Sequence, residues 1–438
     1  MFNPDAVPFE LFVKIFSYLP NNDLAEVSLV CRGFRTIAEP LLYNHPRLTG
    51  HNDRNIPQPL QDFIQRILTR PILANYVRSL EVEWGDDPVD IGPQNVSNIA
   101  LFAAASRRVG LWPLLESRAG AGDNDGRVRR GGGPVDLLRL EGVHVALLLY
   151  LLPNLQFFKF SNTDTFDIFQ ELLTELLFLP SEALPAGLRS LRDIRCSFND
   201  GNTTTTPLTT ILSLPSIRRI RFRVSSYMSE HDPIPTAEPR RSSVTNLNLS
   251  FSHDIIPTSI LAGILAMPMA LTHFTFVDHP KGAGSFDCGE FRRGLALSRN
   301  TLRYLRLTIR MALGIVVEAG TYEQTIGSLH DWPVLRSVRC PLAALLGKRP
   351  EAETARLVDV LPAVVTDFCV DTDWYWRRSG VAEKLREMVD DKGVYGLDQL
   401  KAVTAIMCWG REEESEEILR GAFDAAGVAL TLRTLVYA

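Results

Sequence analysis

The stretch "VPFELFVKIFSYLPNNDLAEVSLVCRGFRTIAEPLLY" fills residues 7–43 and carries three short segments with apolar stripes. In the first segment, Leu11, Ile15 and Leu19 recur every four residues, the spacing that places side chains on one face of a helix. Pro8 suits the first turn of that helix, where a missing N–H costs nothing, and Pro20 ends it. The segment therefore predicts a helix between the two prolines.

Two more helices are expected after Pro20. Asn21 or Asn22 can cap the second, and Gly33 is expected to break or bend the chain before the third. Three helices of this length are too small to enclose all their apolar side chains. Part of this surface must therefore meet either the rest of the chain or another protein, and the pattern alone leaves both open.

The same residues closely resemble the F-box motif, which begins Leu-Pro-x-Glu-Leu and continues with fixed apolar positions. The matching positions are Val7-Pro8-x-Glu10-Leu11, Ile15-Phe16, Leu19-Pro20, Leu24, Val30-Cys31 and Phe34. Val7 replaces the usual leucine, which is a mild departure. The resemblance covers about 40 residues.

In the F-box family the three helices bind the Skp-type adaptor of a cullin–RING ubiquitin ligase. The resemblance implies that a set of apolar residues contacts this adaptor: Pro8, Leu11, Ile15, Phe16, Leu19, Leu24, Val30, Cys31 and Phe34. It also favours a partner protein as the missing part of the helical core.

A six-residue pattern, apolar-x-x-apolar-x-apolar, recurs through the rest of the chain. The copies are Val77/Leu80/Val82, Val135/Leu138/Leu140, Leu155/Phe158/Phe160, Leu191/Ile194/Cys196, Ile217/Ile220/Phe222, Val244/Leu247/Leu249, Leu271/Phe274/Phe276, Leu302/Leu305/Leu307, Leu335/Val338/Cys340, Val365/Phe368/Val370 and a weaker Leu432/Leu435/Tyr437. Helical patterns lie between the copies, at 166–179, 258–267 and 291–298. Each unit thus predicts one short strand and one helix.

This plan resembles leucine-rich repeats, whose strands stack into a curved parallel sheet with helices outside. Only Asn199 fits the position at which that family places an asparagine, so we expect an irregular arc. The expected fold class is α/β: a three-helix F-box at 1–50, a linker and connecting helix at 51–73, and a divergent leucine-rich-repeat-like solenoid at 74–438. Helices near residues 381–391 and 412–427 are expected to cap its end. Divergent repeats behind an F-box resemble the F-box substrate receptors of filamentous fungi.

Three further segments lie outside the repeat pattern. Residues 118–133 are rich in glycine and charge, and residues 230–243 are rich in proline and polar side chains, so both are expected to be exposed loops. Trp374, Tyr375 and Trp376 cluster at 371–378, either packed beneath the terminal helices or exposed as an interface anchor.

Positions four and six of each hexad should face the core, while three and five should face the concave side of the sheet. Six of the ten position-five residues are basic, although the chain has a net charge of -5. The expected binding face comprises Arg139, Phe157, Lys159, Arg195, Arg219, Arg221, Tyr304, Arg306 and Arg339. It could bind an acidic or phosphorylated target through arginine forks. The alternative is an ordinary solvated strand face, and nucleic acid is a weaker possibility.

The sequence gives little support for catalysis or for a cofactor. The six cysteines are scattered without a CxxC pair, and there is no HExxH, phosphate-binding G-x-x-x-x-G-K-[ST] or G-x-S-x-G motif. The longest apolar runs are too short to span a bilayer, so we expect no membrane partner. The expected location is the cytoplasm, the nucleus or both.

Together these features predict a non-catalytic substrate receptor of a Skp–cullin–F-box ubiquitin ligase that binds the Skp-type adaptor, through it cullin, and an unknown target. Two alternatives remain. One is an F-box scaffold or regulator that works outside the ligase. The other is a nucleic-acid-binding repeat protein, whose affinity would fall steeply with salt.

Overall fold

The structure is a computed structural model that describes residues 8–50, 59–84, 96–120, 134–138, 141–162, 172, 175, 184–198, 206–224, 240–252, 256–278, 285–309, 322–347, 355–371, 378–407 and 413–434. The chain divides into two compact units. Unit 1 comprises Met1–Asn199 and Leu214–Ile217, and unit 2 comprises Asp200–Ser213 and Arg218–Ala438. Each unit is described by itself.

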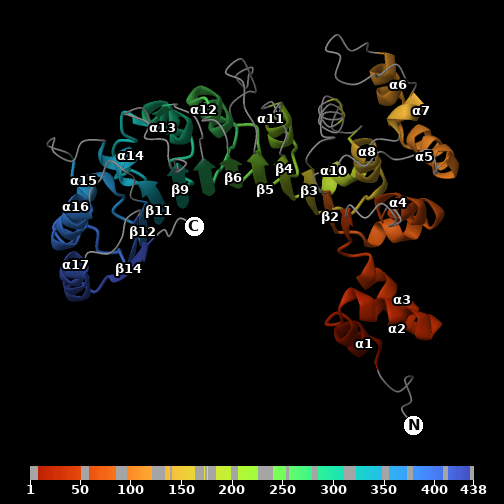
Figure 1. The fold of residues 1–438 in the computed structure, drawn as a ribbon, viewed down its shortest axis with the longest axis horizontal. Helices are drawn as coiled ribbons and strands as arrows, with labels where there is room; N and C mark the ends of the chain where they lie inside the picture. Colours follow the sequence, from red (N-terminus) through yellow and green to blue (C-terminus); the bar gives the residue numbers. More distant parts are fainter. Residues whose placement is uncertain are drawn as a thin grey trace. The chain divides into compact units, whose positions relative to one another are not determined.

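Unit 1 begins with three helices, shown in red in Figure 1: α1 (Phe9–Phe16), α2 (Asn21–Val30) and α3 (Arg32–Leu42). They enclose a small core of Phe16, Leu24, Ile37 and Ala38. The three helices predicted from the sequence are therefore confirmed.

The boundaries of these helices differ from the prediction at two places. Pro20 occupies the cap position of α2 and makes no side-chain hydrogen bond there, so neither asparagine caps this helix. Gly33 lies inside α3, and the break between α2 and α3 is at Cys31, whose backbone is extended. The Cys31 thiol caps α3 by accepting a hydrogen bond from the Phe34 N–H. A side chain that satisfies a free N–H fixes the helix start without glycine.

Unit 1 continues with four parallel strands in sequential order: β1 (Arg47–Gly50), β2 (Ser79–Trp84), β3 (Phe157–Asn162) and β4 (Asp193–Phe198). The segments between them form α4 (Pro59–Thr69), the 3-10 helix η2 (Pro71–Tyr76), α5 (Val96–Val109), α6 (Trp112–Gly120), α7 (Pro134–Leu137), α8 (Glu141–Leu151) and α10 (Ala186–Ser190). The connecting helix expected after residue 51 is α4.

The strand predicted for the hexad at 135–140 is wrong for the residues of this hexad that the structure describes. Residues 134–137 form helix α7, and α8 begins at residue 141. Pro134 stands at the first position of α7, where proline favours a helix. Arg139, expected on the binding face, lies outside the described residues.

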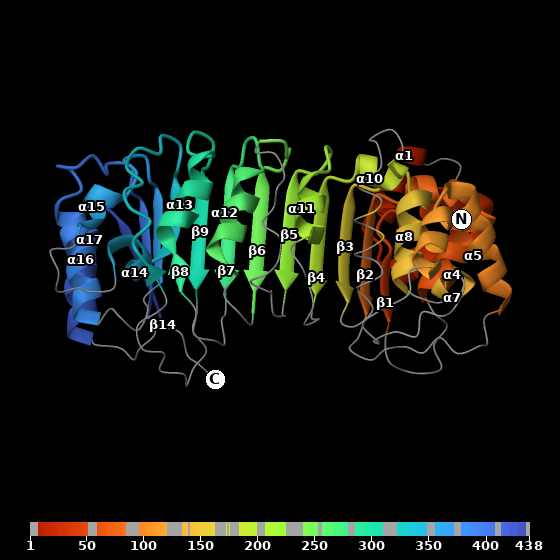
Figure 2. The same cartoon turned by 90° about the horizontal axis from the view of Figure 1, so that it is seen from above.

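Unit 2 contains eight strands in a second run of parallel neighbours: β5 (Arg219–Val224), β6 (Asn246–Phe251), β7 (His273–Asp278), β9 (Tyr304–Ile309), β11 (Ser337–Pro341), β12 (Asp367–Asp371), β13 (Ala402–Met407) and β14 (Ala429–Thr434). A separate pair, β8 (Phe286–Asp287) and β10 (Tyr322–Glu323), is also parallel. Figure 2 shows the strands of unit 2 side by side.

Seven helices are described in unit 2: α11 (Thr206–Leu212), α12 (Thr258–Ala266), α13 (Cys288–Ala296), α14 (Leu342–Leu346), α15 (Leu357–Val360), α16 (Arg378–Asp390) and α17 (Glu413–Ala425). Helices α12 and α13 pack on one face of the sheet (Figures 1 and 2). The helices expected at 258–267, 291–298, 381–391 and 412–427 are thus present, while most of 166–179 lies outside the described residues.

Side-chain burial alternates along the strands as the hexads predicted. On β5, Ile220, Phe222 and Val224 are buried, whereas the three arginines that alternate with them are exposed. Alternation of this kind follows from the two-residue period of a strand, because one face packs on the helices. Positions four and six therefore build the core.

The C-terminal strands correct the sequence prediction. Strand β13 supplies an unpredicted copy, Leu400/Val403/Ala405, all three of whose side chains are buried. In the last strand, Leu430 and Leu432 pair with Val403 and Ala405. The inward positions therefore lie five residues before the predicted Leu435 and Tyr437, and residues 435–438 lie outside the described range.

Short polar side chains form hydrogen bonds between neighbouring repeats, each of which consists of a strand and the turn before it. The Thr245 hydroxyl donates to the Arg218 carbonyl at 3.2 Å, and the Thr272 hydroxyl donates to the Thr245 carbonyl at 3.0 Å. Equivalent bonds are Asn154 to Asn75, Ser190 to Pro153, Ser216 to Leu188, Thr301 to Leu271 and Thr366 to Arg336. Each of these bonds gives a backbone carbonyl of one repeat a side-chain donor from the next repeat.

The loops predicted at 118–133 and 230–243 are described only at their ends. Residues 118–120 belong to α6, which corrects the start of the first loop, and residues 121–133 lie outside the described residues. The same holds for 230–239 and for the aromatic cluster Trp374, Tyr375 and Trp376.

Candidate functional site

Exposed apolar side chains distinguish the three-helix domain. Leu11 and Ile15 on α1 are 50% and 53% exposed, and Val30 at the end of α2 is 70% exposed. Pro8 and Cys31 are exposed as well. Large apolar side chains exposed on a small domain are typical of protein-binding surfaces. The five residues are therefore available for contact with a partner.

Other residues predicted to touch the adaptor instead hold the domain together. Phe16 and Leu24 are 5% and 3% exposed, and they form the centre of the core. The Phe34 ring packs against the rings of Phe12 and Phe16, with centroids 5.2 and 5.3 Å apart. Leu19 packs against the same core. Phe16 and Leu24 therefore support the surface from beneath and do not form it.

The structure adds three exposed apolar residues that the sequence prediction missed. Phe9 and Tyr18 extend the α1 surface, and Leu29 precedes Val30 on α2. A helical-wheel signal was present, because Leu11, Ile15 and Tyr18 follow the i, i+4, i+7 spacing of one face.

Direct contacts join the three-helix domain to the sheet of unit 1. The Arg70 guanidinium donates to both carboxylate oxygens of Glu39, at 2.6 and 2.7 Å. This hydrogen-bonded pair lowers the pKa of Glu39 below its ordinary value. The Asn44 carbonyl also accepts hydrogen bonds from the backbone N–H groups of Arg78 and Ser79, both at 3.1 Å. The joint between α3 and strand β2 is thus fixed by charge and by backbone bonds.

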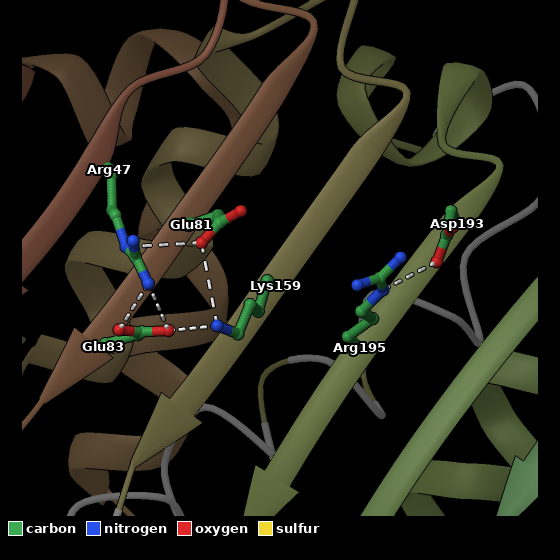
Figure 3. Close-up of polar contacts among 6 residues, drawn as sticks. All are labelled: Arg47, Glu81, Glu83, Lys159, Asp193 and Arg195. Carbon is green, nitrogen blue, oxygen red and sulfur yellow. Dashed lines mark hydrogen bonds and ion pairs between the residues drawn. The ribbon is translucent and has the colours of Figure 1, made fainter.

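In unit 1, the basic position-five residue Lys159 lies in an ion-paired cluster with Arg47, Glu81 and Glu83 (Figure 3). Lys159 on β3 contacts both glutamates of β2, with its ammonium 3.7 Å from Glu81 and hydrogen-bonded to Glu83. Arg47 on β1 reaches Glu81 at 3.5 Å and Glu83 at 3.3 Å. The Lys159 hydrogen bond lowers the pKa of Glu83.

Arg195 has an acidic partner on its own strand. Its guanidinium lies 3.7 Å from the Asp193 carboxylate (Figure 3). The same guanidinium lies 4.8 Å from the centre of the Phe157 ring, a cation–π contact. Phe157 and Arg195 were both predicted on the binding face, and the structure brings them together.

Arg339 in unit 2 is also neutralised. It donates two hydrogen bonds to Asp371, at 3.0 and 3.1 Å, and both side chains are mostly buried. Burial by itself lowers the pKa of Arg339, but Asp371 more than offsets this and raises it. The Thr308 hydroxyl donates to the same carboxylate at 3.1 Å. Arg339 therefore belongs to a closed polar cluster.

The remaining predicted residues of unit 2 share one face of the sheet. Arg219 and Arg221 are exposed on β5, together with Arg223. Strand pairing places Tyr304 beside His273, and the two rings stack with centroids 6.0 Å apart. Arg306 is half-buried, and its Nε donates to the Thr308 hydroxyl at 3.4 Å.

The described residues hold no group of three or more histidine, cysteine, aspartate or glutamate side chains suited to a metal ion. None of the described helices is both long and apolar enough to cross a bilayer. The structure thus directs attention to two surfaces: the apolar one on α1 and α2, and the polar one on the strands.

Comparison with known families concerns the three-helix domain. Residues 5–49 match the F-box-like family model, so the chain carries an F-box-like domain in α1–α3. Domains of this class bind a Skp1-type adaptor and thereby connect a protein to a ubiquitin ligase. No curated protein matches the sequence of the chain.

Proposed function

We propose that the protein is the substrate-recognition subunit of a Skp–cullin–F-box ubiquitin ligase. The observation that carries this proposal is the F-box-like match at 5–49 together with the exposed Leu11, Ile15 and Val30 on that domain. The F-box-like domain would dock on the adaptor, and the face of the strands opposite the helices would hold a target protein. The chain itself would supply proximity and no covalent chemistry.

The repeated strand-and-turn units support the leucine-rich-repeat-like part of the proposal. Their parallel strands follow one another in sequential order, as in stacked repeats. Such an arc would give the target a continuous sheet face. Cullin would join through the adaptor, in the cytoplasm or nucleus. The free thiols of Cys196 and Cys340, both buried, are consistent with a reducing compartment.

Co-purification with a Skp1-type adaptor tests the proposal. The double variant Leu11→Arg and Ile15→Arg places two charges where an apolar contact is expected, so adaptor affinity should fall at least about 100-fold. Because both side chains are half exposed in the isolated chain, circular dichroism should show an unchanged fold.

A matched control keeps the charge change but moves it elsewhere. Met269 and Val394 are apolar and exposed in unit 2, so Met269→Arg with Val394→Arg should leave adaptor recovery unchanged. Equal recovery with the α1 variant would refute the docking surface. Adaptor binding without cullin in the reconstituted complex would refute the ligase assignment and favour a scaffold.

A further inference from the structure

Strand β5 carries an arginine strip, defined as Arg219, Arg221 and Arg223, on its exposed face. The three side chains alternate with the buried Ile220, Phe222 and Val224. Because a strand rises about 3.3 Å per residue, successive guanidinium stems leave the sheet about 7 Å apart. The strip is therefore a short, evenly spaced row of positive charges.

The residues in register with the strip on strand β6 are all neutral. Strand β6 places Asn246, Asn248 and Ser250 opposite the three arginines. Among the described residues, no carboxylate forms an ion pair with any of the three. Lys159, Arg195 and Arg339 each have one. The strip thus presents positive charge beside neutral hydrogen-bonding side chains, whereas Lys159, Arg195 and Arg339 are already paired with carboxylates.

The next strand continues this polar surface. His273 and Thr275 on β7 pair with Asn246 and Asn248. Burial lowers the pKa of His273, and the positive charges of Arg303 and Arg219 lower it further. His273 therefore lies within the electric field of the strip.

We propose that the arginine strip, with Asn246 and Asn248 beside it, binds an extended acidic peptide whose anionic groups occupy alternate positions. This inference rests on the proposed function and names the recognition element of the target. Alternate side chains of an extended peptide project on one side about 7 Å apart, the spacing of the strip. Each arginine fork matches one carboxylate or phosphate. The asparagine amides can donate to and accept from the peptide backbone.

A peptide fits this surface better than single-stranded nucleic acid. Bases bind sheets by stacking on aromatic rings, and on this face the His273 and Tyr304 rings already stack on each other. Three cations in a chain of net charge -5 also give a weak electrostatic basis for a phosphodiester strand. A peptide needs only the local row of charges.

Fluorescence anisotropy with labelled peptides tests the proposal on the full chain. One twelve-residue peptide carries glutamate at three alternate positions, and a second carries phosphoserine at those positions. A third has serine there, and a fourth has its three glutamates contiguous. We expect the first two to bind at least about 10-fold more tightly than the last two, because only they match the strip. If the glutamate peptide binds more tightly than the phosphoserine peptide, the strip recognises carboxylates; the reverse order identifies phosphates.

Charge-matched variants locate the site. Arg219→Gln, Arg221→Gln and Arg223→Gln together should weaken binding of the better peptide at least about 30-fold, because three charge-assisted contacts are lost. The control changes Arg293, Arg386 and Arg420 to Gln, which removes the same charge from exposed positions on α13, α16 and α17. The control should change affinity less than about 3-fold.

Several outcomes overturn the proposal. It fails if the peptides with alternate glutamates or alternate phosphoserines bind no better than the serine peptide, or if the strip variant binds them like the wild type. It also fails if a decathymidine oligonucleotide binds more tightly than both of these peptides. Adaptor binding by the strip variant is measured as well and should stay intact. The Leu11→Arg and Ile15→Arg variant tests the proposed function separately, because it should lose the adaptor and keep the peptide.

Discussion

Lys159 on β3 and Arg221 on β5 occupy the same position of their repeats, yet their surroundings are opposite. Lys159 lies directly beside Glu81 on β2 and contacts Glu83 as well. Arg221 lies beside Asn248 on β6. The residue opposite in the neighbouring strand decides whether a cation on a sheet is satisfied or available. A column of basic residues is therefore not a uniform binding stripe.

The two regions also differ in what their charges do for the fold. The ion-paired cluster around Lys159 is about one-third exposed, so each pair contributes at most about 1 kcal/mol. The arginine strip places three like charges on one strand, where they repel one another mildly. Charge thus supports the fold around Lys159 and provides an open surface on β5.

The largest effect should come from beneath the two surfaces. Phe160 on β3 and Phe222 on β5 are buried on the core face of their strands. Phe160→Ala or Phe222→Ala should each lower the free energy of unfolding by about 3–5 kcal/mol. Urea unfolding measures the loss, and hydrogen exchange assigns it to each strand. Equal losses would confine the difference between the regions to their exposed faces. A loss below about 1 kcal/mol at one site would show that its core is loosely packed.

The histidines of the two regions provide the next prediction. His144 on α8 is buried against the Phe102 ring, and burial lowers its pKa to about 4. Its pKa in the unfolded chain is about 6.5, so the unfolded state binds the proton more readily. The free energy of unfolding should therefore fall by about 3 kcal/mol between pH 6.5 and 4 and then level off.

Replacing His144 with leucine should remove this pH dependence, as measured by urea unfolding across the same range. The exposed His330 in unit 2 provides the control, because His330→Leu should leave the profile unchanged. An unaltered slope in the His144 variant would assign the acid sensitivity to other groups.

The smallest effect concerns the cations themselves. Lys159→Met should lower the free energy of unfolding by about 0.5–1 kcal/mol at low salt, because Glu83 loses the hydrogen bond from Lys159 and keeps only its contact with Arg47. Salt should reduce this difference. Arg221→Met should change stability by less than about 0.5 kcal/mol, since it breaks no ion pair in the described structure. Equal losses from both changes would contradict the electrostatic contrast.

Much of the strand arrangement could be predicted, because burial alternates with a period of two on each strand. The failure at Val135 has a clear cause. Residues 135 and 138 are three apart, which also fits one face of a helix, and Pro134 favours helix initiation. Strand β13 was missed because Ala405 occupies the sixth position, where larger apolar residues mark the other copies.

The candidate site was harder to predict. The F-box resemblance identified the apolar residues but not their directions: Ile15 and Phe16 are neighbours, yet only Phe16 points into the core. The direction depends on where α2 and α3 pack. The ion-paired cluster was hidden because Glu83 lies beyond the six positions of the repeat pattern, and its contact with Lys159 exists only after the strands pair. Charge partners of this kind depend on tertiary structure.

The threonine and serine bonds between turns have a consequence for how such a chain can lengthen or shorten. The four threonine hydroxyls, on Thr245, Thr272, Thr301 and Thr366, reach back 27–30 residues, each to the turn just before its own. A duplicated copy would bring its own donor and leave a fresh acceptor for its successor, so an internal duplication or deletion of one whole copy keeps every link intact. Gains and losses of single copies should therefore preserve the local fold while changing how many strand faces the chain presents.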